Sequence, residues 1–228
     1  MSNNGIGSFF QFQRVNWPNM WGATWETIWV TVVSMIAVII FGVLLGLLLF
    51  ETRDSTSTPV KILNWIVAAF VNIFRSIPFI ILIVLMLPAT QALVGTIMGP
   101  RAALPSLILS ASPFYARMVE VAFTDLDHGE IEMARATGAT EWQIITKVLI
   151  PETMPALVSN ATVTTISLIG YTAMAGAIGA GGLGNLAYLD GFQDNNNTVT
   201  LVATVIIVII VFIFQFIGDT LSKKLDKR

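Results

Sequence analysis

The sequence predicts an all-α fold in which a bundle of helices passes several times through a lipid bilayer. Of the 228 residues, 55% are hydrophobic and only 11% are charged, whereas about a quarter of an ordinary soluble domain is charged. Several uncharged apolar runs reach roughly 20 residues, the length that a helix needs to cross about 30 Å of hydrocarbon. The 12 Lys and Arg and 14 Asp and Glu residues are too few to cover a soluble surface, so we expect a polytopic transmembrane bundle with five spans.

The first, fourth and fifth predicted spans are marked by an absence of charge. The first covers about 27–50 and ends at Glu51, and the fifth covers about 199–218 and ends at Asp219. The fourth, about 155–180, is uncharged but rich in serine, threonine, glycine and alanine. Each of these runs is long enough for one transmembrane helix.

The second and third predicted spans are interrupted by residues that are unusual in hydrocarbon. The run 60–86 contains Arg75 and Pro78, and neither half is long enough to cross alone, so we predict one helix. Arg75 then lies in the protein interior or near an interface. There it either contacts a substrate carboxylate or pairs structurally with a carbonyl or an acid of a neighbouring helix. The run 102–118 is short and carries two prolines, and we expect it to span because the topology requires it.

Lysine and arginine residues, which concentrate in cytoplasmic loops, predict the orientation. With five spans and the N-terminus outside, nine of them lie on the inner side, two on the outer side, and Arg75 within a span. The inner set is Arg53, Lys61, Arg117, Arg135, Lys147, Lys223, Lys224, Lys227 and Arg228, and the outer set is Arg14 and Arg101. We therefore predict an outer segment, 1–20, a membrane domain, 21–219, with a cytoplasmic segment at about 119–151, and a cytoplasmic tail, 220–228.

The chemistry that other functional classes require is missing from the sequence. There is no cysteine and only one histidine, His128, so we expect no metal site, no catalytic residue and no cofactor bound by this chain. No basic stripe with interleaved aromatic residues occurs, which argues against nucleic-acid binding. An ion-coupled secondary transporter usually carries acids inside its spans, and every Asp and Glu here falls in a predicted loop or at a span end.

The sequence also contains no nucleotide-binding motif that could supply energy for transport. A Gly-Lys-Ser/Thr phosphate loop, which would hold the phosphates of a nucleotide, occurs nowhere in the chain. Energy for any transport would therefore come from another protein. A pathway lined by a single such chain would be thin, and we expect a symmetric homodimer.

The segment 130–151, which we call the elbow, contains the start and stop signals of two short helices. The first helix ends at Gly138, because glycine takes the left-handed conformation that follows many helices. The second begins at Thr140, which with Gln143 forms a capping box, and it runs to the end of the elbow. On these grounds the elbow either docks into a groove of another protein or packs as a cap on the bundle.

A spaced signature lies in the elbow. It reads Glu132-Met133-Ala134, three residues, Gly138, nine residues, and Val148-Leu149-Ile150-Pro151. This spacing resembles the EAA signature of ABC importer permeases, which is Glu-Ala-Ala, three residues, Gly, nine residues and Ile-x-Leu-Pro. The signature departs from that pattern at Met133, Val148 and Ile150, where one apolar residue replaces another.

The resemblance covers nearly the whole chain and indicates the methionine branch of these permeases. The stretches 72–79, 116–120 and 176–184 are similar to those of D- and L-methionine importer permeases. Such a resemblance implies the type I ABC importer permease fold with five spans in each subunit.

The same resemblance implies partners and a mechanism. Two permease chains pair with two copies of an ATPase, which bind ATP and Mg²⁺, and an extracytoplasmic binding protein delivers the substrate. The complex lies in the bacterial cytoplasmic membrane and imports methionine by alternating access, while this chain hydrolyses no ATP and is not an enzyme. Another small amino acid or a peptide is the alternative substrate, and an ion-coupled secondary transporter is the alternative class.

The resemblance further implies how the elbow couples the ATPase to the spans. It implies that Glu132 is a polar contact, that Met133 occupies the middle position of the signature, and that Ala134 and Gly138 allow close approach. Pro151 is expected to set the angle at which the chain leaves the elbow.

A polar stripe in the fourth span is the candidate translocation surface. Its members follow at steps of four, three, four and three, which places them on one helix face. They are Asn160, Thr164, Ser167, Tyr171 and Met174. Hydrogen-bonding groups avoid lipid, so the stripe either lines a pathway, where Tyr171 and Met174 contact a thioether substrate, or packs helices together.

Glycines mark two further places. Gly42 and Gly46 in the first span form a GxxxG pair, which we interpret as close helix packing. The turn 179–184 is predicted on the outer side, where a docking surface for a binding protein and an ordinary re-entrant turn are equal alternatives.

Overall fold

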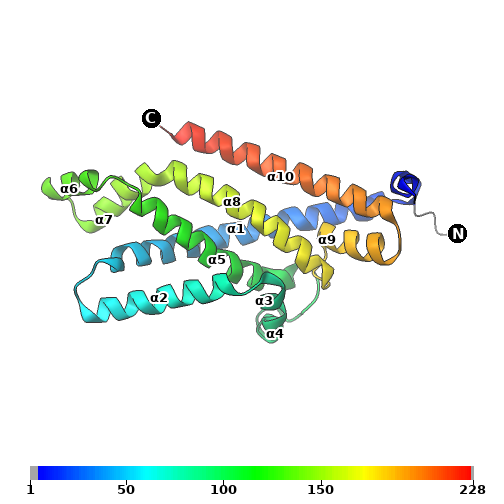
Figure 1. Cartoon of the computed structure of the whole chain (residues 1–228), viewed down its shortest axis with the longest axis horizontal. Coiled ribbons are helices and arrows are strands. Elements are labelled where there is room, and N and C mark those ends of the chain that lie inside the picture. The colour runs from blue at the N-terminus through cyan, green and yellow to red at the C-terminus, as the bar shows by residue number, and fades with distance from the viewer. Residues whose placement is uncertain (1–4, 227–228) are drawn as a thin grey trace. The chain divides into compact units, whose positions relative to one another are not determined.

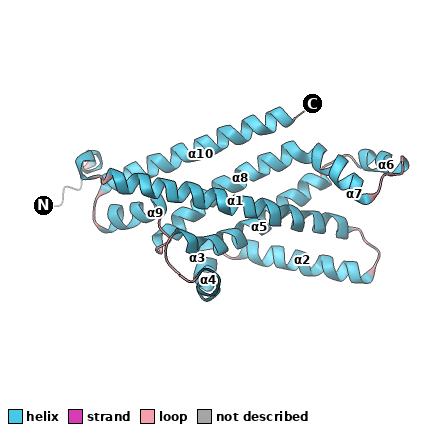
Figure 2. Ribbon diagram, turned by 180° about the vertical axis from the view of Figure 1, so that it is seen from behind, coloured by secondary structure: helices cyan, strands magenta, loops and turns pink. Residues whose placement is uncertain are grey.

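The computed structural model describes residues 5–226, and helices account for almost all of them (Figures 1 and 2). No β-strand occurs in this range, so the prediction of an all-α fold is confirmed. Residues 1–4 of the predicted outer segment, and Lys227 and Arg228 of the predicted cytoplasmic tail, lie outside the described residues.

Ten α-helices follow two short 3₁₀-helices, Ile6–Phe10 and Phe12–Arg14. In chain order they are α1 (Trp17–Arg53), α2 (Thr58–Ser76), α3 (Phe79–Leu85), α4 (Leu87–Val94), α5 (Pro100–Thr124), α6 (His128–Ala136), α7 (Glu141–Ile144), α8 (Ile150–Ala177), α9 (Gly182–Leu186) and α10 (Asn197–Leu225). Two π-helical segments follow α7 and α9, at Ile145–Leu149 and Ala187–Gln193 respectively.

Within residues 5–226, α1 and α10 are each long and apolar enough to cross a membrane. Two bent pairs pass the same test when each is taken as one span, namely α2 with α3, and Glu141–Ala177 with Gly182–Gln193. The helix α5, which contains the predicted third span, has 25 residues. The helices are longer than the predicted spans. A charged residue marks the end of the stretch that can lie in hydrocarbon, but the helical backbone hydrogen bonds continue past it.

The prediction of one unbroken helix over 60–86 is wrong. The helix α2 ends at Ser76 and α3 begins at Phe79, with a bend of 108° between them. Pro78 causes this break, because proline donates no backbone hydrogen bond and disfavours the helical conformation of the residue before it. Arg75 therefore lies in the last turn of α2, where it is exposed, and no residue of the described range bonds to it.

The chain divides into two compact units, to which α1, α5, α8 and α10 all contribute. The first unit consists of Met1–Ala37, Ile77–Ser110 and Thr165–Phe214, and the second of Val38–Ser76, Ala111–Thr164 and Gln215–Arg228. In the first unit, the beginning of α1 packs with the end of α8, with α9 and with the beginning of α10. Its buried apolar core contains Val15, Met20, Ala23, Ile169, Leu183, Leu186, Val199, Val202, Ala203 and Ile210.

In the second unit, the end of α1 packs against α2 and α5 around Leu49, Val67, Val71 and Ala116. The packing is close enough to require glycine on α1. A Cβ atom on Gly46 would lie 2.7 Å from the carbonyl oxygen of Ala116, which is well inside van der Waals contact. The interpretation of the GxxxG pair as a close-packing element is confirmed.

This close packing predicts opposite effects for the same substitution at two glycines of α1. Gly46→Ala should lower the free energy of unfolding by about 1–3 kcal/mol, because its methyl group meets α5 backbone. Gly22→Ala should raise it by up to about 1 kcal/mol through helix propensity, because a Cβ there meets nothing within 4 Å. Thermal unfolding in detergent measures both, and equal shifts for the two variants would contradict the packing.

Candidate functional site

The elbow begins with α6, whose two ends are fixed by local hydrogen bonds. The Asp127 carboxylate accepts a hydrogen bond from the Gly129 N–H at 2.9 Å and caps the start of the helix. At the other end, Gly138 has a φ angle of +84°, the left-handed conformation expected from the sequence. The first helix of the elbow and its stop signal are therefore confirmed.

The second helix of the elbow, α7, begins with the predicted capping box. The Thr140 hydroxyl accepts from the Gln143 N–H at 3.3 Å, and the Gln143 side chain accepts from the Thr140 N–H at 2.9 Å. Two backbone donors at the helix start are satisfied in this way. The start of α7 is thus set by its own sequence.

An ion pair joins the two helices of the elbow. The Arg135 guanidinium donates two parallel hydrogen bonds to the Glu141 carboxylate, from Nε to Oε1 and from Nη2 to Oε2, both at 3.1 Å. The hydrogen bond with Glu141, and then the charge of that carboxylate, raise the pKa of Arg135. Both side chains are exposed, so the pair adds little stability. Its two-pronged geometry joins α6 to α7 across the turn at Gly138.

Pro151 does not end the elbow as a bend in the chain. A π-helical turn, Ile145–Leu149, continues from α7, and α8 begins at Ile150 with Pro151 in its first turn. Proline has no N–H to donate back into this turn, so Pro151 interrupts the backbone hydrogen-bond ladder where the π-helical turn meets α8. The wider helical turn lies just before Pro151, where the sequence predicts the exit from the elbow.

Two large apolar side chains project from the elbow. Met133 on α6 is 66% exposed and Trp142 on α7 is 71% exposed. Glu132 is also exposed, and Ala134 is half-buried. The residues of the signature are spread over α6, the turn at Gly138 and the start of α8, which contains Pro151. Trp142 lies between the fixed points of the signature, so the spacing gave no reason to single it out.

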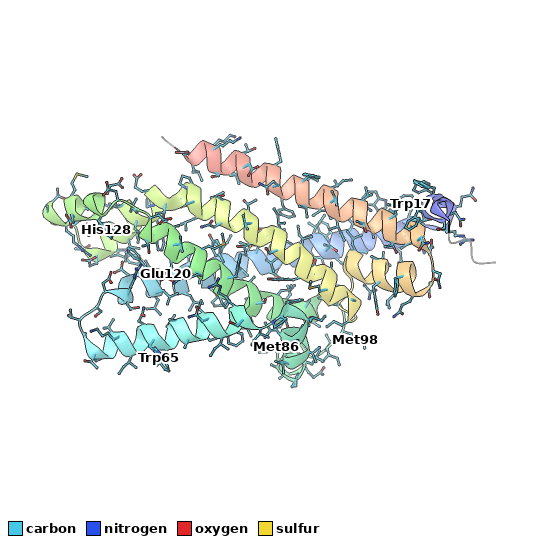
Figure 3. All side chains as sticks on the ribbon, in the orientation of Figure 1. Trp17, Trp65, Met86, Met98, Glu120 and His128 are labelled. Carbon is cyan, nitrogen blue, oxygen red and sulfur yellow. The ribbon has the colours of Figure 1, made fainter. Side chains whose placement is uncertain are left out.

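A hollow of about 310 Å³ lies between the end of α1 and the elbow within the second unit. Acids and bases both line it, including Glu51, Arg53 and Asp54 from the α1 end and Arg135 and Glu141 from the elbow. His128, labelled in Figure 3, begins α6 at its edge. The elbow thus presents a mixed-charge recess beside its two exposed apolar side chains.

In the first unit, α1 holds the glycine turn 179–184 by two side chains. The Gly182 N–H donates to the Glu26 carboxylate at 2.8 Å, and the Leu183 N–H donates to the Thr27 hydroxyl at 2.9 Å. Gly181 and Gly182 have φ angles of +75° and +74°, which other residues rarely adopt. These bonds satisfy backbone donors at the start of α9 that would otherwise lack partners. They join positions 156 residues apart, so no local pattern predicted them.

The first two members of the polar stripe are held by hydrogen bonds. Asn160 donates from Nδ2 to the Met118 carbonyl at 3.1 Å and so ties α8 to α5. Thr164 donates to the Asn160 carbonyl of its own helix at 2.7 Å. Thr164 is fully buried in this structure, and its place on the pathway surface stays a prediction.

The other three members belong to the first unit and differ in exposure. Ser167 is half-buried. The Tyr171 ring stacks on Phe79 of α3 with centroids 4.8 Å apart and an angle of 11° between the rings. Met174 is 49% exposed. The stack explains how α3 is held against α8 after the break at Pro78.

Comparisons with known proteins agree with one another. The model of a family described as binding-protein-dependent transport system inner membrane component matches residues 39–228. The methionine import system permease protein MetP of Bacillus subtilis is 57% identical over 217 residues, covering 95% of this chain and 98% of that protein. The probable D-methionine transport system permease protein MetI of Pasteurella multocida is 43% identical over 165 residues, covering 72% and 76% respectively.

Solved structures give the same result at the level of the fold. A chain of the MetNI methionine ABC transporter in an inward-facing conformation is 45% identical, with a TM-score of 0.88, and the match covers 92% of this chain and 97% of that one. A chain of an amino acid ABC transporter determined with histidines is 18% identical, with a TM-score of 0.68 over 92% of this chain and 99% of that one. The second similarity supports the fold alone.

The contact between α1 and the glycine turn predicts a local effect of Glu26→Ala. Removing the carboxylate leaves the Gly182 N–H without its partner, which costs about 1–3 kcal/mol locally. We expect faster hydrogen exchange at Gly182 and its neighbours in α9, with unchanged exchange in the elbow.

The control for that experiment is Asp190→Ala, which removes a nearby acid that does not hold the turn. Mass spectrometry of exchanged peptides resolves the two regions. If exchange in α9 were the same in Glu26→Ala as in the wild type, the carboxylate would not hold the turn.

Proposed function

Because this chain belongs to the family of inner membrane components of binding-protein-dependent transport systems, we propose that it is the permease subunit of an ABC importer for methionine. The single observation that carries this proposal is its 57% identity to a methionine import permease along 98% of that protein. The family consists of transport subunits, so the chain is not an enzyme. A permease for another small amino acid or a peptide is the second candidate, since substrate identity rests on the relatives alone.

The proposed complex has three kinds of protein. Two copies of this chain form the pathway, two ATPase copies bind ATP and Mg²⁺, and an extracytoplasmic binding protein delivers methionine. The absence of a phosphate loop from the sequence supports a separate ATPase. The similarity to a methionine ABC transporter structure supports the assembly.

We propose that the permease is a multi-pass protein of the bacterial cytoplasmic membrane, with its N-terminus outside and its C-terminus in the cytoplasm. The distribution of basic residues supports this orientation, because nine Lys and Arg fall on the predicted inner side and two on the outer side. The membrane domain is 21–219 and the tail is 220–228. The elbow then faces the cytoplasm, where the ATPase lies.

The elbow is proposed to bind the ATPase. Large exposed apolar side chains in a polar, water-facing segment mark contacts with other proteins, and Met133 and Trp142 are such side chains. The capping box and the Arg135–Glu141 pair stiffen the elbow, so movement of the ATPase would reach α8 as a rigid displacement. Glu132, Ala134 and Gly138 keep their predicted roles in polar contact and close approach.

The substrate pathway is proposed to follow the exposed part of the polar stripe. Met174 is half-exposed and chemically soft, which suits contact with a thioether. Ser167, Tyr171 and Asn160 are its further predicted members. The Arg75 side chain has no hydrogen-bond or ion-pair partner in the described part of this chain, and its contact with a substrate carboxylate or with a carbonyl or acid of a neighbouring helix stays a prediction.

The proposed contact between the elbow and the ATPase predicts that Trp142→Ala weakens binding of the ATPase. Anchoring tryptophans cost about 2 kcal/mol or more when truncated, so the dissociation constant should rise about 30-fold. Trp65→Ala on α2 is the matched control, because Trp65 is equally exposed at 72% but lies outside the elbow (Figure 3). Binding of the purified ATPase measured by interferometry tests this, and equal affinities for both variants would exclude Trp142 as an anchor.

The transport function predicts ATP-dependent methionine uptake by vesicles that contain the permease, its ATPase and its binding protein. A panel of labelled amino acids and small peptides separates methionine from the second candidate substrate. Uptake driven by an ion gradient in the absence of ATP would overturn the proposed class. Vesicles prepared without the ATPase are the control, and they should accumulate nothing above background.

A further inference from the structure

A second cavity, which shares Arg53 with the recess beside the elbow, lies between α1, α2 and α5 within the second unit. Its volume is about 250 Å³. Three charged side chains line it, namely Arg53 from α1 and Arg117 and Glu120 from α5, and Figure 3 labels Glu120 on α5. Arg117 and Glu120 do not line the recess and have no part in the coupling role of the elbow.

The two guanidinium groups keep free donors toward the cavity. Arg117 donates from Nη1 to Oε2 of Glu120 at 2.6 Å, and its side chain is half-exposed. Arg53 makes one long hydrogen bond, from Nη1 to the Thr124 hydroxyl at 3.4 Å. Each guanidinium has five N–H donors, so several remain for an anion.

The Glu120 carboxylate is the acidic counterpart of these groups. Its side chain is only 9% exposed, and one of its oxygens, Oε2, takes the Arg117 hydrogen bond. A buried carboxylate needs more than one partner to offset its loss of water. A ligand that brings an ammonium group would provide that second partner.

The remaining walls of the cavity are apolar or carry amides. Leu49, Ala68 and Val71 supply hydrocarbon, and Asn72 supplies an exposed side-chain amide. The amide of Asn64 is already held by α1, because it donates to the Leu49 carbonyl at 3.3 Å and to the Thr52 hydroxyl at 2.8 Å. The cavity thus combines two cations, one anion and an apolar wall.

We propose that this cavity binds a small zwitterionic amino acid with an apolar side chain. Arg53 and Arg117 take the carboxylate, Glu120 takes the ammonium group, and the side chain lies on Ala68, which is partly exposed above the buried Leu49 and Val71. Methionine has all three features, namely a carboxylate, an ammonium group and an apolar side chain. The physiological role of the site therefore rests on the proposed function as a methionine permease.

The existing Arg117–Glu120 bond makes this a weak site. A ligand must share or open that pair, and the energy of the lost bond is subtracted from binding. Weak binding suits a transport pathway, because conduction requires that a substrate leave a site as readily as it enters. The site would therefore bind methionine weakly and release it quickly, within the same unit as the elbow.

Ligands that lack one charge test the proposed recognition. The purified permease–ATPase complex, prepared without binding protein, is dialysed against labelled methionine, methionine methyl ester and 3-(methylthio)propionate. We expect saturable binding of methionine and at least about tenfold weaker binding of the other two, because each loses one charge-assisted contact. Equal binding of the ester or of the propionate would overturn the proposal.

Two variants tie that binding to the cavity. Glu120→Gln and Arg53→Gln should each weaken methionine binding about tenfold, by removing one charged partner. Arg53→Gln leaves the Arg117–Glu120 pair intact and alters an exposed side chain, so it gives a result even if Glu120→Gln fails to fold. Asp219→Asn, which changes an exposed acid on α10, is the control and should bind as the wild type does. Unchanged binding in both cavity variants would overturn the assignment.

A phospholipid headgroup with a phosphate and an amine shares this chemistry, and lipid composition separates it from an amino acid. Methionine binding should be the same in nanodiscs of phosphatidylglycerol alone and in nanodiscs containing phosphatidylethanolamine. Loss of binding in the latter would assign the cavity to lipid and overturn the amino-acid site. Wild-type uptake with ATP and binding protein is measured in parallel, so failure of the cavity is distinguished from failure of the proposed transport function.

Discussion

Backbone polar groups within the hydrocarbon of a membrane have no water to bond with, so a break in a helix there needs partners from the chain itself. The start of α9 shows how backbone donors are satisfied, because Glu26 and Thr27 accept from the N–H groups of Gly182 and Leu183. At the other main break, Pro78 brings no N–H that would need a partner. Each break lies beside a contact with a helix distant in sequence, from α9 to α1 and from α3 to α8 respectively.

The elbow keeps its shape through local hydrogen bonds and a few buried apolar side chains. Its caps at Asp127 and Thr140 satisfy local donors, and the Arg135–Glu141 pair joins its two helices across the turn at Gly138. Ile131, Ile144 and Leu149 are buried, whereas Met133 and Trp142 remain exposed. A segment held in this way, with exposed apolar side chains, suits the proposed transmission of movement from the ATPase.

Features set by near neighbours could be predicted from the sequence, and features set by distant contacts could not. The long helices, the stop at Gly138 and the capping box follow from residues within a few positions of each other. The ion pair of Arg135 crosses a turn and was missed. The single helix over 60–86 was wrong because counting apolar residues underestimated the effect of Pro78. Periodicity placed Thr164 on the same helix face as the rest of the polar stripe but could not show that it is fully buried, because burial depends on packing with distant residues.

The central claim is that the elbow contacts the ATPase, and site-specific cross-linking tests it most directly. The chain has no cysteine, so Ala136→Cys introduces a unique thiol at an exposed position of the elbow that is not a proposed anchor. Gln193→Cys introduces one after α9, on the side that the topology predicts to be outside. A short thiol-to-amine cross-linker is applied to the assembled complex in membranes. The account predicts a permease–ATPase product from Ala136→Cys and none from Gln193→Cys. A product from Gln193→Cys, or the absence of one from Ala136→Cys, would contradict it.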